Sequence, residues 1–411
     1  MTVTAGAPPI VAGGLGAAFW RMWTASVVSR FGDALRGPAL SLVAAGLTRD
    51  PETIALVVIA GQVPGLLFGL LGGALADRWD RRLSMAGTDG LRCAMVVGLA
   101  IAVATGNVNV GLLMVFAFAM STVGTLFDSS SFAILPELVP ADRLAKANGR
   151  MQVGSTISGG LLGGPVAGGL FVVAAALPFA VDAVTFALAA LLALTLPRMS
   201  AAQAAAAPRA SLWGAAVAGV RWMWREPSLR LLAILSAAAN LVIGALLAVI
   251  VLLILDVFGV PEAAYGLFTL VGAAGGIAGG VFASRIGARY GILPALRRVL
   301  VVQAVALTAL AAASGQVVVG GAALGVFIAG SAIWNVLVNT YQQQAVPAEL
   351  RGRTGAASRV VGLASAPIGA ALGGLIAGQF GVASVAVFGA GVFVVLAAVS
   401  WRALTGGPAV S

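Results

Sequence analysis

Long apolar stretches alternate with short polar turns along almost the whole chain. Each stretch has about 20 residues or more, the length that an α-helix needs to cross roughly 30 Å of hydrocarbon. Alternating segments of about ten residues, the pattern of membrane β-strands, are not visible. The pattern predicts twelve membrane-spanning helices, at 22–47, 53–76, 84–105, 108–128, 151–175, 177–197, 230–256, 263–284, 299–314, 317–340, 355–378 and 382–401.

The composition agrees with this pattern and narrows the chemistry. The chain is 60% hydrophobic and 9% charged, whereas a soluble protein carries about a quarter charged residues. We therefore expect an all-α polytopic membrane protein. The chain contains no histidine, and its only lysine, Lys146, is not part of a phosphate-binding loop. We expect no metal site, no cofactor and no enzymatic activity. Cys93 is the only cysteine, which excludes an internal disulfide.

The basic residues lie on one side of the predicted membrane. Arginines crowd the even-numbered turns between spans, and Arg49 is the only basic residue in the odd-numbered turns. The positive-inside rule then places both termini and all even-numbered turns in the cytoplasm. This placement explains the net charge of +10 without a nucleic-acid partner.

Two segments recur at nearly constant displacement, which predicts a duplicated unit. GGALADR (72–78) returns as GGVFASR (279–285), 207 residues later, and GGL at 168–170 returns 205 residues later at 373–375. We predict an N-terminal six-helix bundle at 1–197, a cytoplasmic linker with an amphipathic segment at 198–229, and a C-terminal six-helix bundle at 230–411. Transporters built from parallel repeats bind substrate between their halves, near the midplane.

The first cytoplasmic turn, GGALADRWDRR (72–82), resembles motif A of the major facilitator superfamily (MFS). This resemblance implies a conformational gate, in which an aspartate accepts hydrogen bonds from a facing helix N-terminus. The alternative is a merely solvated basic turn. Asp89 and Arg92, three residues apart near the motif, are assigned to the same gate, more as a structural pair than as a transport site. The positions that match the motif are Gly73, Asp77, Arg78, Arg81 and Arg82.

GSTISGGLLGGPVAGGL (154–170) in the fifth span resembles motif C, the glycine–proline signature of MFS antiporters. Its GPxxGG core falls on Gly164, Pro165, Gly168 and Gly169. Small residues also serve ordinary close packing of membrane helices, which is the alternative. The resemblance implies export rather than uptake.

Three further segments, at 135–150, 179–194 and 219–232, resemble the MFS branch that contains the enterobactin exporter and macrolide-efflux proteins. The resemblance covers nearly the whole chain and implies two pseudo-symmetric six-helix bundles. The fourth span lacks the arginine of motif B, which many proton-coupled drug antiporters carry. Proton coupling therefore needs other residues.

Arg30, Asp33 and Arg36 interrupt the first span. Their spacing of three puts them on one helical face, which must point to a cavity or to a partner helix. They form either an ion triad that fixes packing or a coupling site, in which Asp33 takes up a proton and the arginines tune it or hold an anionic part of the substrate. Asn240 occupies the corresponding position of the second half, 207 residues later.

Other polar residues within the spans are candidates of lower rank. Asp128 and Asp182 are candidate proton relays, although gate or packing roles fit them as well. Trp334, Asn335 and Asn339 on the tenth span are candidates for the substrate cavity, and a hydrogen bond between helices is the alternative for the asparagines.

These observations predict a secondary transporter of the bacterial inner membrane that exports a small amphipathic compound against proton entry. The expected partners are the transported small molecule and membrane lipids, and the chain is expected to be a monomer. The alternatives are uptake of a nutrient, transport of a lipid-like compound, or a sensor or scaffold that transports nothing.

Overall fold

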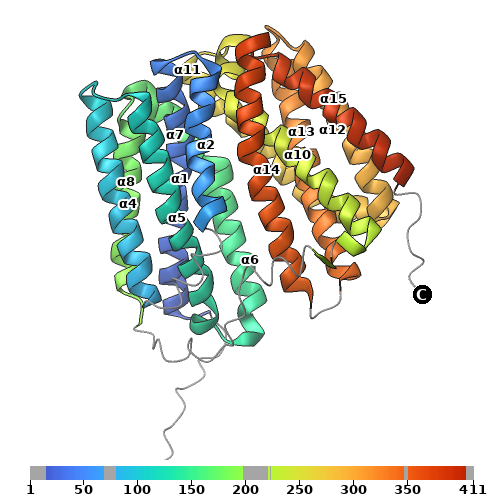
Figure 1. Cartoon of the computed structure of the whole chain (residues 1–411). Coiled ribbons are helices and arrows are strands. Elements are labelled where there is room, and N and C mark those ends of the chain that lie inside the picture. Colours follow the sequence, from blue (N-terminus) through green and yellow to red (C-terminus); the bar gives the residue numbers. More distant parts are fainter. Residues whose placement is uncertain (1–14, 69–79, 198–220, 223, 347–349, 404–411) are drawn as a thin grey trace, which may run out of the picture.

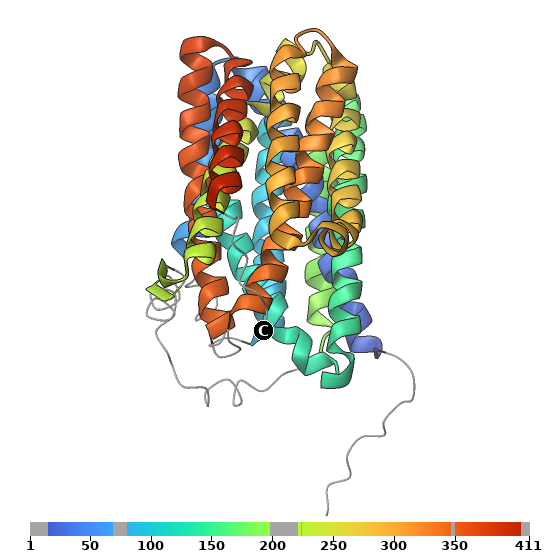
Figure 2. The ribbon, with the colours of Figure 1, turned by 90° about the vertical axis from the view of Figure 1, so that its right-hand side faces the viewer.

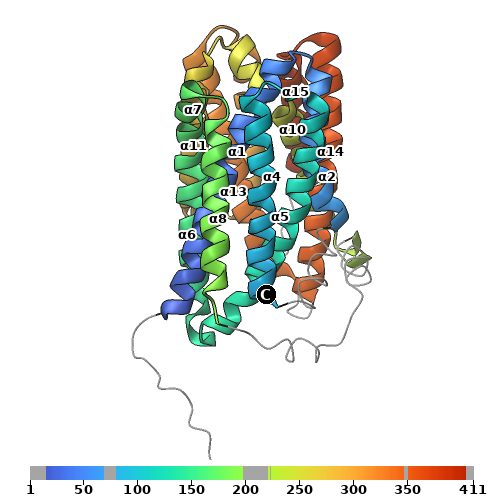
Figure 3. The same ribbon diagram turned by 90° about the vertical axis from the view of Figure 1, so that its left-hand side faces the viewer.

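The computed structural model describes residues 15–68, 80–197, 221–222, 224–346 and 350–403, and the regular structure within these ranges is helical (Figure 1). The expected all-α fold is confirmed. The long helices run roughly along one axis, with the second half of the chain in front in Figure 2 and the first half in front in Figure 3.

The helices follow the predicted spans closely. The first half contains α1 (Ala17–Leu47), α2 (Pro51–Phe68), α4 (Arg81–Ala104), α5 (Val110–Leu138), the short η1 (Ala141–Arg143), α6 (Leu144–Ser155), η2 (Thr156–Leu162), α7 (Gly163–Val173) and α8 (Leu177–Leu194). The second half contains α10 (Pro227–Leu252), η4 (Leu253–Val257), α11 (Glu262–Tyr290), α12 (Ile292–Ala312), α13 (Val317–Ala345), α14 (Arg351–Phe380) and α15 (Ser384–Ala403). The end of the second predicted span and most of the predicted linker lie outside the described residues.

The first span stands apart from the others in its charge. Eleven helices among the described residues are long and apolar enough to cross a membrane, and α1 is not one of them. Every 18-residue window within α1 contains at least three charged residues, because Arg21, Arg30, Asp33 and Arg36 are spread along it. The 31 residues of α1 are nevertheless long enough to cross. Its packing against α8, α7 and α6 lets the charged face point into the bundle.

The fifth span is not a uniform α-helix. Between α6 and α7, residues Thr156–Leu162 form the π-helical segment η2. Such segments are rare and occur often at functional sites. The sequence pattern of the fifth span did not predict this segment.

Two helices begin at a side chain that caps them, and a glycine separates two others. The Asp80 carboxylate accepts from the backbone N–H of Arg82, at 2.9 Å, and caps α4; Asn109 caps α5 through the N–H of Leu112, at 2.9 Å. Gly291 separates α11 from α12 with a φ of 78°, a conformation that glycine adopts without steric cost.

Helices of each half pack mainly against one another. In the first half α1 and α4 pack on α8, and α2 packs on α5; in the second half α10 packs on α14, and α11 and α12 pack on α13. One buried apolar cluster lies around Phe179 and Phe186 in the first half; another lies around Phe327 and Phe393 in the second half and extends to Leu42 and Ile54 of the first. The halves meet mainly through the pairs α2–α14 and α7–α11.

One end of the molecule joins the two halves tightly. We refer to it as the Arg49 end: it comprises the α1–α2 connection, η4 and the start of α11. Arg49 forms ion pairs with Asp256 at 3.1 Å and with Glu262 at 3.7 Å. In the described part of the chain, every ion pair found between the halves involves Arg49. The start of α1 and the end of α15 lie at the opposite end (Figure 1).

Candidate functional site

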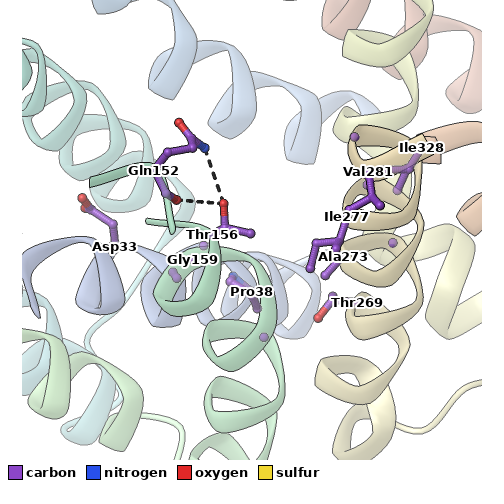
Figure 4. Close-up of a pocket in the computed structure, with 16 residues that line it drawn as sticks. Asp33, Pro38, Gln152, Thr156, Gly159, Thr269, Ala273, Ile277, Val281 and Ile328 are labelled. Atoms are coloured by element: carbon purple, nitrogen blue, oxygen red, sulfur yellow. Dashed lines mark hydrogen bonds between the residues drawn. The ribbon is translucent and has the colours of Figure 1, made fainter. Parts of the chain in front are cut away.

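A cavity of about 850 Å³ lies between the two halves. Its walls come from α1, the α6–η2–α7 span, α11 and Ile328 of α13 (Figure 4). The lining is mainly glycine, alanine and isoleucine, with Gln152, Thr156 and Thr269 as neutral polar groups. Among the described residues that line it, Asp33 is the only charged one. The cavity therefore suits a largely apolar compound and offers it one carboxylate.

Glycines close the cavity toward the Arg49 end. A Cβ atom at Gly164 of α7 would overlap the Thr269 hydroxyl of α11, and one at Gly168 would lie 3.0 Å from the Gly266 backbone. Only glycine allows the two helices to approach this closely. From Thr269 the lining continues along α11 to Val281, away from the Arg49 end. The cavity is thus closed on one side and extends toward the other.

Asp33 connects the cavity to a buried group of charges. Its carboxylate accepts two hydrogen bonds from Arg92 Nη2 on α4, at 3.0 and 3.1 Å, and one from Arg36 Nη2 on its own helix. About 30% of the Asp33 side chain is exposed, whereas Arg92 is almost fully buried. Asp33 is therefore both a cavity residue and the partner of two guanidinium groups.

Each of these guanidinium groups holds a second carboxylate. Arg36 donates to Asp182 of α8 at 3.2 Å, and Arg92 contacts Asp89 at 3.5 Å. Asp89 also accepts a hydrogen bond from the Ser29 hydroxyl at 3.1 Å. Carboxylates and guanidinium groups thus alternate in one row. We refer to this row as the ion chain; its members are, in order, Asp89, Arg92, Asp33, Arg36 and Asp182.

The ends of the ion chain are fully buried. The side chains of Asp89 and Asp182 are 0% exposed, and each has one oxygen, Asp89 Oδ2 and Asp182 Oδ1, without a hydrogen-bond partner. The Phe186 ring lies against both guanidinium groups, 4.6 Å from Arg92 and 5.8 Å from Arg36. Burial of an uncompensated charge costs several kcal/mol even after the surroundings relax. The charges of the ion chain must therefore be balanced almost completely.

Arg30 does not belong to the ion chain. The spacing of Arg30, Asp33 and Arg36 suggested that both arginines flank Asp33, but Arg30 pairs with Asp128 of α5 at 3.0 Å. About 39% of the Arg30 side chain and 62% of the Asp128 side chain are exposed. The second arginine on Asp33 is Arg92 instead, because Arg92 of α4 lies opposite Asp33 and Asp128 of α5 lies opposite Arg30.

The sequence placed Asp89 and Arg92 at the predicted gate, but the structure joins them to Asp33. Their spacing of three was visible in the sequence, and so was their position at the cytoplasmic end of the third span. The contact across 59 residues of chain, from Arg92 to Asp33, was not. The roles of Phe186 and Ser29 beside these charges were also missed, since neither side chain is unusual in a membrane helix.

The predicted polar residues of the second half do not line the cavity. Asn240 of α10 donates to the Ser236 backbone carbonyl at 3.0 Å. Trp334 is buried between α13 and α10, where its Nε1–H donates to the Ser236 hydroxyl at 3.0 Å. Asn335 and Asn339 are exposed elsewhere on α13. Arg30 and Arg36, the other two residues predicted for the cavity, are absent from its lining as well.

The two motifs differ in how far the structure describes them. In motif C, Gly164 lines the cavity, Gly168 packs on α11, and a Cβ atom at Gly169 would meet open space. In motif A, Gly73, Asp77 and Arg78 and the Arg81 side chain lie outside the described residues, whereas Arg82 donates to the Leu196 carbonyl at 3.2 Å.

The sequence matches one protein family over most of its length. The model of the Major Facilitator Superfamily matches residues 22–366. An uncharacterized MFS-type transporter of Sinorhizobium fredii is 27% identical over 369 residues, which cover 86% of each chain.

Other relatives match over a shorter stretch. An uncharacterized MFS-type transporter of Mycobacterium tuberculosis is 34% identical over 133 residues, 32% of this chain and 30% of that protein. Macrolide efflux protein A of Streptococcus pyogenes is 29% identical over 141 residues, 34% of this chain and 35% of that protein. The chain thus matches about a third of the length of these two relatives.

Solved structures share the fold. A bacterial homologue of the iron transporter ferroportin in its inward-facing state superposes with a TM-score of 0.75 at 15% identity, over 96% of this chain and all of that one. The same homologue in its outward-facing state gives a TM-score of 0.60 at 16% identity, over 95% of this chain and all of that one.

Proposed function

Because the chain belongs to the major facilitator superfamily of transporters, we propose that it is a proton-coupled antiporter that exports a small amphipathic compound. The observation that carries this proposal is the position of Asp33. In the described part of the chain it is the only charged group on the cavity wall, and it is also bonded to Arg36 and Arg92 of the ion chain. A change of charge at Asp33 therefore affects both the cargo and the ion pairs that link α1 to α4 and α8.

The cavity supports an amphipathic cargo. Its apolar wall favours a hydrophobic body, and Gln152, Thr156 and Thr269 provide hydrogen-bonding groups. A fully ionic cargo would lose more hydration than three neutral groups replace.

Coupling follows from what protonation does to the partners of Asp33. When Asp33 takes up a proton, Arg36 and Arg92 lose the carboxylate that they share and must find other partners. Loss of the proton restores these bonds. The protonated and deprotonated forms of Asp33 therefore differ in the ion pairs among α1, α4 and α8. Alternating access requires a difference of this kind between helices.

The cavity is closed at the Arg49 end, and the distribution of arginines predicts that the opposite end faces the cytoplasm. This is one of the two states of alternating access, which exporters and importers share. Two other observations support export. Motif C is typical of antiporters, and one of the relatives is named a macrolide efflux protein. We further propose that the chain acts as a monomer in the bacterial inner membrane, with the proton gradient as its energy source and without a cofactor.

The proposal is tested in inverted membrane vesicles that carry an acidic lumen. Hydrophobic antibiotics, siderophores and dyes are added one at a time, and lumenal alkalinisation is followed for the wild type, Asp33→Asn and Asp142→Asn. Asp142 is an exposed carboxylate outside the spans and serves as the matched control. We expect at least one compound to trigger alkalinisation in the wild type and in the control, and none in Asp33→Asn. An unchanged signal in Asp33→Asn would refute coupling at this residue, and accumulation of a compound only in right-side-out vesicles would indicate uptake instead.

A further inference from the structure

The ion chain has more carboxylates than guanidinium groups. It contains Asp89, Asp33 and Asp182 but only Arg92 and Arg36, so with every group ionised it carries one negative charge. Four of the five side chains are buried or nearly so, and an uncompensated charge among them is costly. One proton would make the group neutral.

The hydrogen bonds show which carboxylates have an oxygen that can take up that proton. Both oxygens of Asp33 accept N–H groups, so a proton there would displace an arginine. Asp89 Oδ2 and Asp182 Oδ1 accept nothing. While these bonds are intact, the proton therefore fits on one of the two ends of the ion chain, and Asp33 takes it up only when its bonds to Arg36 and Arg92 are broken.

The surroundings of both ends contain no further cation. Asp182 on α8 faces Arg36 and Asp33 from α1, and Arg92 and the Cys93 thiol from α4, while α7 carries no ionisable residue. Asp89 faces Asp33 and the Ser29 hydroxyl from α1, and Arg92 from its own helix α4. From α5, Asp128 is already bound to Arg30. Among the described residues, nothing besides Arg36 and Arg92 offsets the three carboxylates.

We infer that the ion chain stores one proton, held on Asp89 or Asp182, and that this proton exchanges with the cavity only through Asp33. Asp33 is the only member of the row that lines the cavity, so a proton that leaves an end carboxylate must pass it to reach water. This inference deepens the proposed coupling by naming where the proton resides. It also predicts a rule: the number of stored protons equals the number of carboxylates minus the number of guanidinium groups.

The rule is tested by infrared spectroscopy of the purified protein at neutral pH, without any substrate. A protonated carboxyl group has a carbonyl stretch that a carboxylate lacks. We expect this band in the wild type, and its loss in each of Asp33→Asn, Asp89→Asn and Asp182→Asn, because two carboxylates then face two guanidinium groups. Arg36→Gln and Arg92→Gln should roughly double the band, since two carboxylates then lack a cation. Asp128→Asn, which alters an ion pair outside the row, should leave it unchanged.

The possible results distinguish the stored proton, the counting rule and the proposed antiport from one another. Absence of the band in the wild type overturns the inference at once, even if the variants cannot be purified. A band that survives in any of the three asparagine variants overturns the rule. Because no cargo is involved, this result is independent of the vesicle assay. Transport without the band would refute the stored proton alone, and the band without proton-coupled transport would refute the antiport alone.

Discussion

Gly32 shows how a single residue positions the ion chain. A Cβ atom at this position of α1 would overlap both Asp182 Oδ1 and the Thr185 hydroxyl of α8. The absence of a side chain lets α1 approach α8 closely enough for Arg36 to reach Asp182. The sequence shows a glycine next to a charged triad but does not show what lies opposite it.

We expect Gly32→Ala to destabilise the protein by about 1–3 kcal/mol, the usual cost of overpacking. Gly46→Ala on the same helix is the control, because a Cβ atom there would meet nothing within 4 Å. Thermal unfolding in detergent should show a lower midpoint for Gly32→Ala and a nearly unchanged one for Gly46→Ala. Equal thermal midpoints for Gly32→Ala and Gly46→Ala would mean that α1 and α8 accommodate the added methyl group without cost.

At the scale of whole elements, end residues decide where a helix starts, and α2 is a clear case. Asp50 precedes Pro51, and its carboxylate accepts the backbone N–H of Thr53 at 2.9 Å as well as the Thr53 hydroxyl. These hydrogen bonds lower the pKa of Asp50, which lies outside the membrane spans. Such a cap is predictable from sequence, since its partner is three residues away.

We expect Asp50→Ala to reduce the free energy of unfolding by ~1 kcal/mol. The contribution of the carboxylate depends on pH, because its pKa is lower in the folded than in the unfolded protein. It is fully present above the unfolded pKa and is lost as pH falls through the folded pKa. The difference in thermal midpoint between wild type and Asp50→Ala should therefore shrink in acid. Asp50→Asn, which can still cap, should lack this pH dependence, and a pH dependence retained in Asp50→Asn would assign the effect to another group.

For the whole molecule, the pairing of the two halves determines which side of the cavity is open. The ion pairs of Arg49 and the glycine contacts between α7 and α11 hold the Arg49 end closed. About half of the Arg49 and Asp256 side chains is exposed. Exposed ion pairs contribute little and are weakened by salt, so the closed end can open without a large energetic penalty.

We expect Arg49→Ala to raise the accessibility of the closed end by up to about five-fold, because an exposed pair contributes at most ~1 kcal/mol. The reporter is a cysteine at Ala55, which is buried in α2, in a Cys93→Ser background. Its rate of maleimide labelling should rise in Arg49→Ala. Added salt should raise the labelling rate only in the protein that retains Arg49. A labelling rate that changes neither with Arg49→Ala nor with added salt would show that the α2–α14 packing alone keeps this end closed.

The sequence by itself determined the helices, the approximate span limits and the inward direction of Asp33. Hydrophobic length and the cost of exposing charge to lipid act locally, so they can be read along the chain. The partners of Asp33 and Arg36 were decided only by tertiary structure. Helical spacing relates residues three or four apart, whereas Arg36 and Asp182 are 146 residues apart and meet only because α1 packs on α8. The balance of charge in the ion chain, and the side on which the cavity closes, follow from that packing.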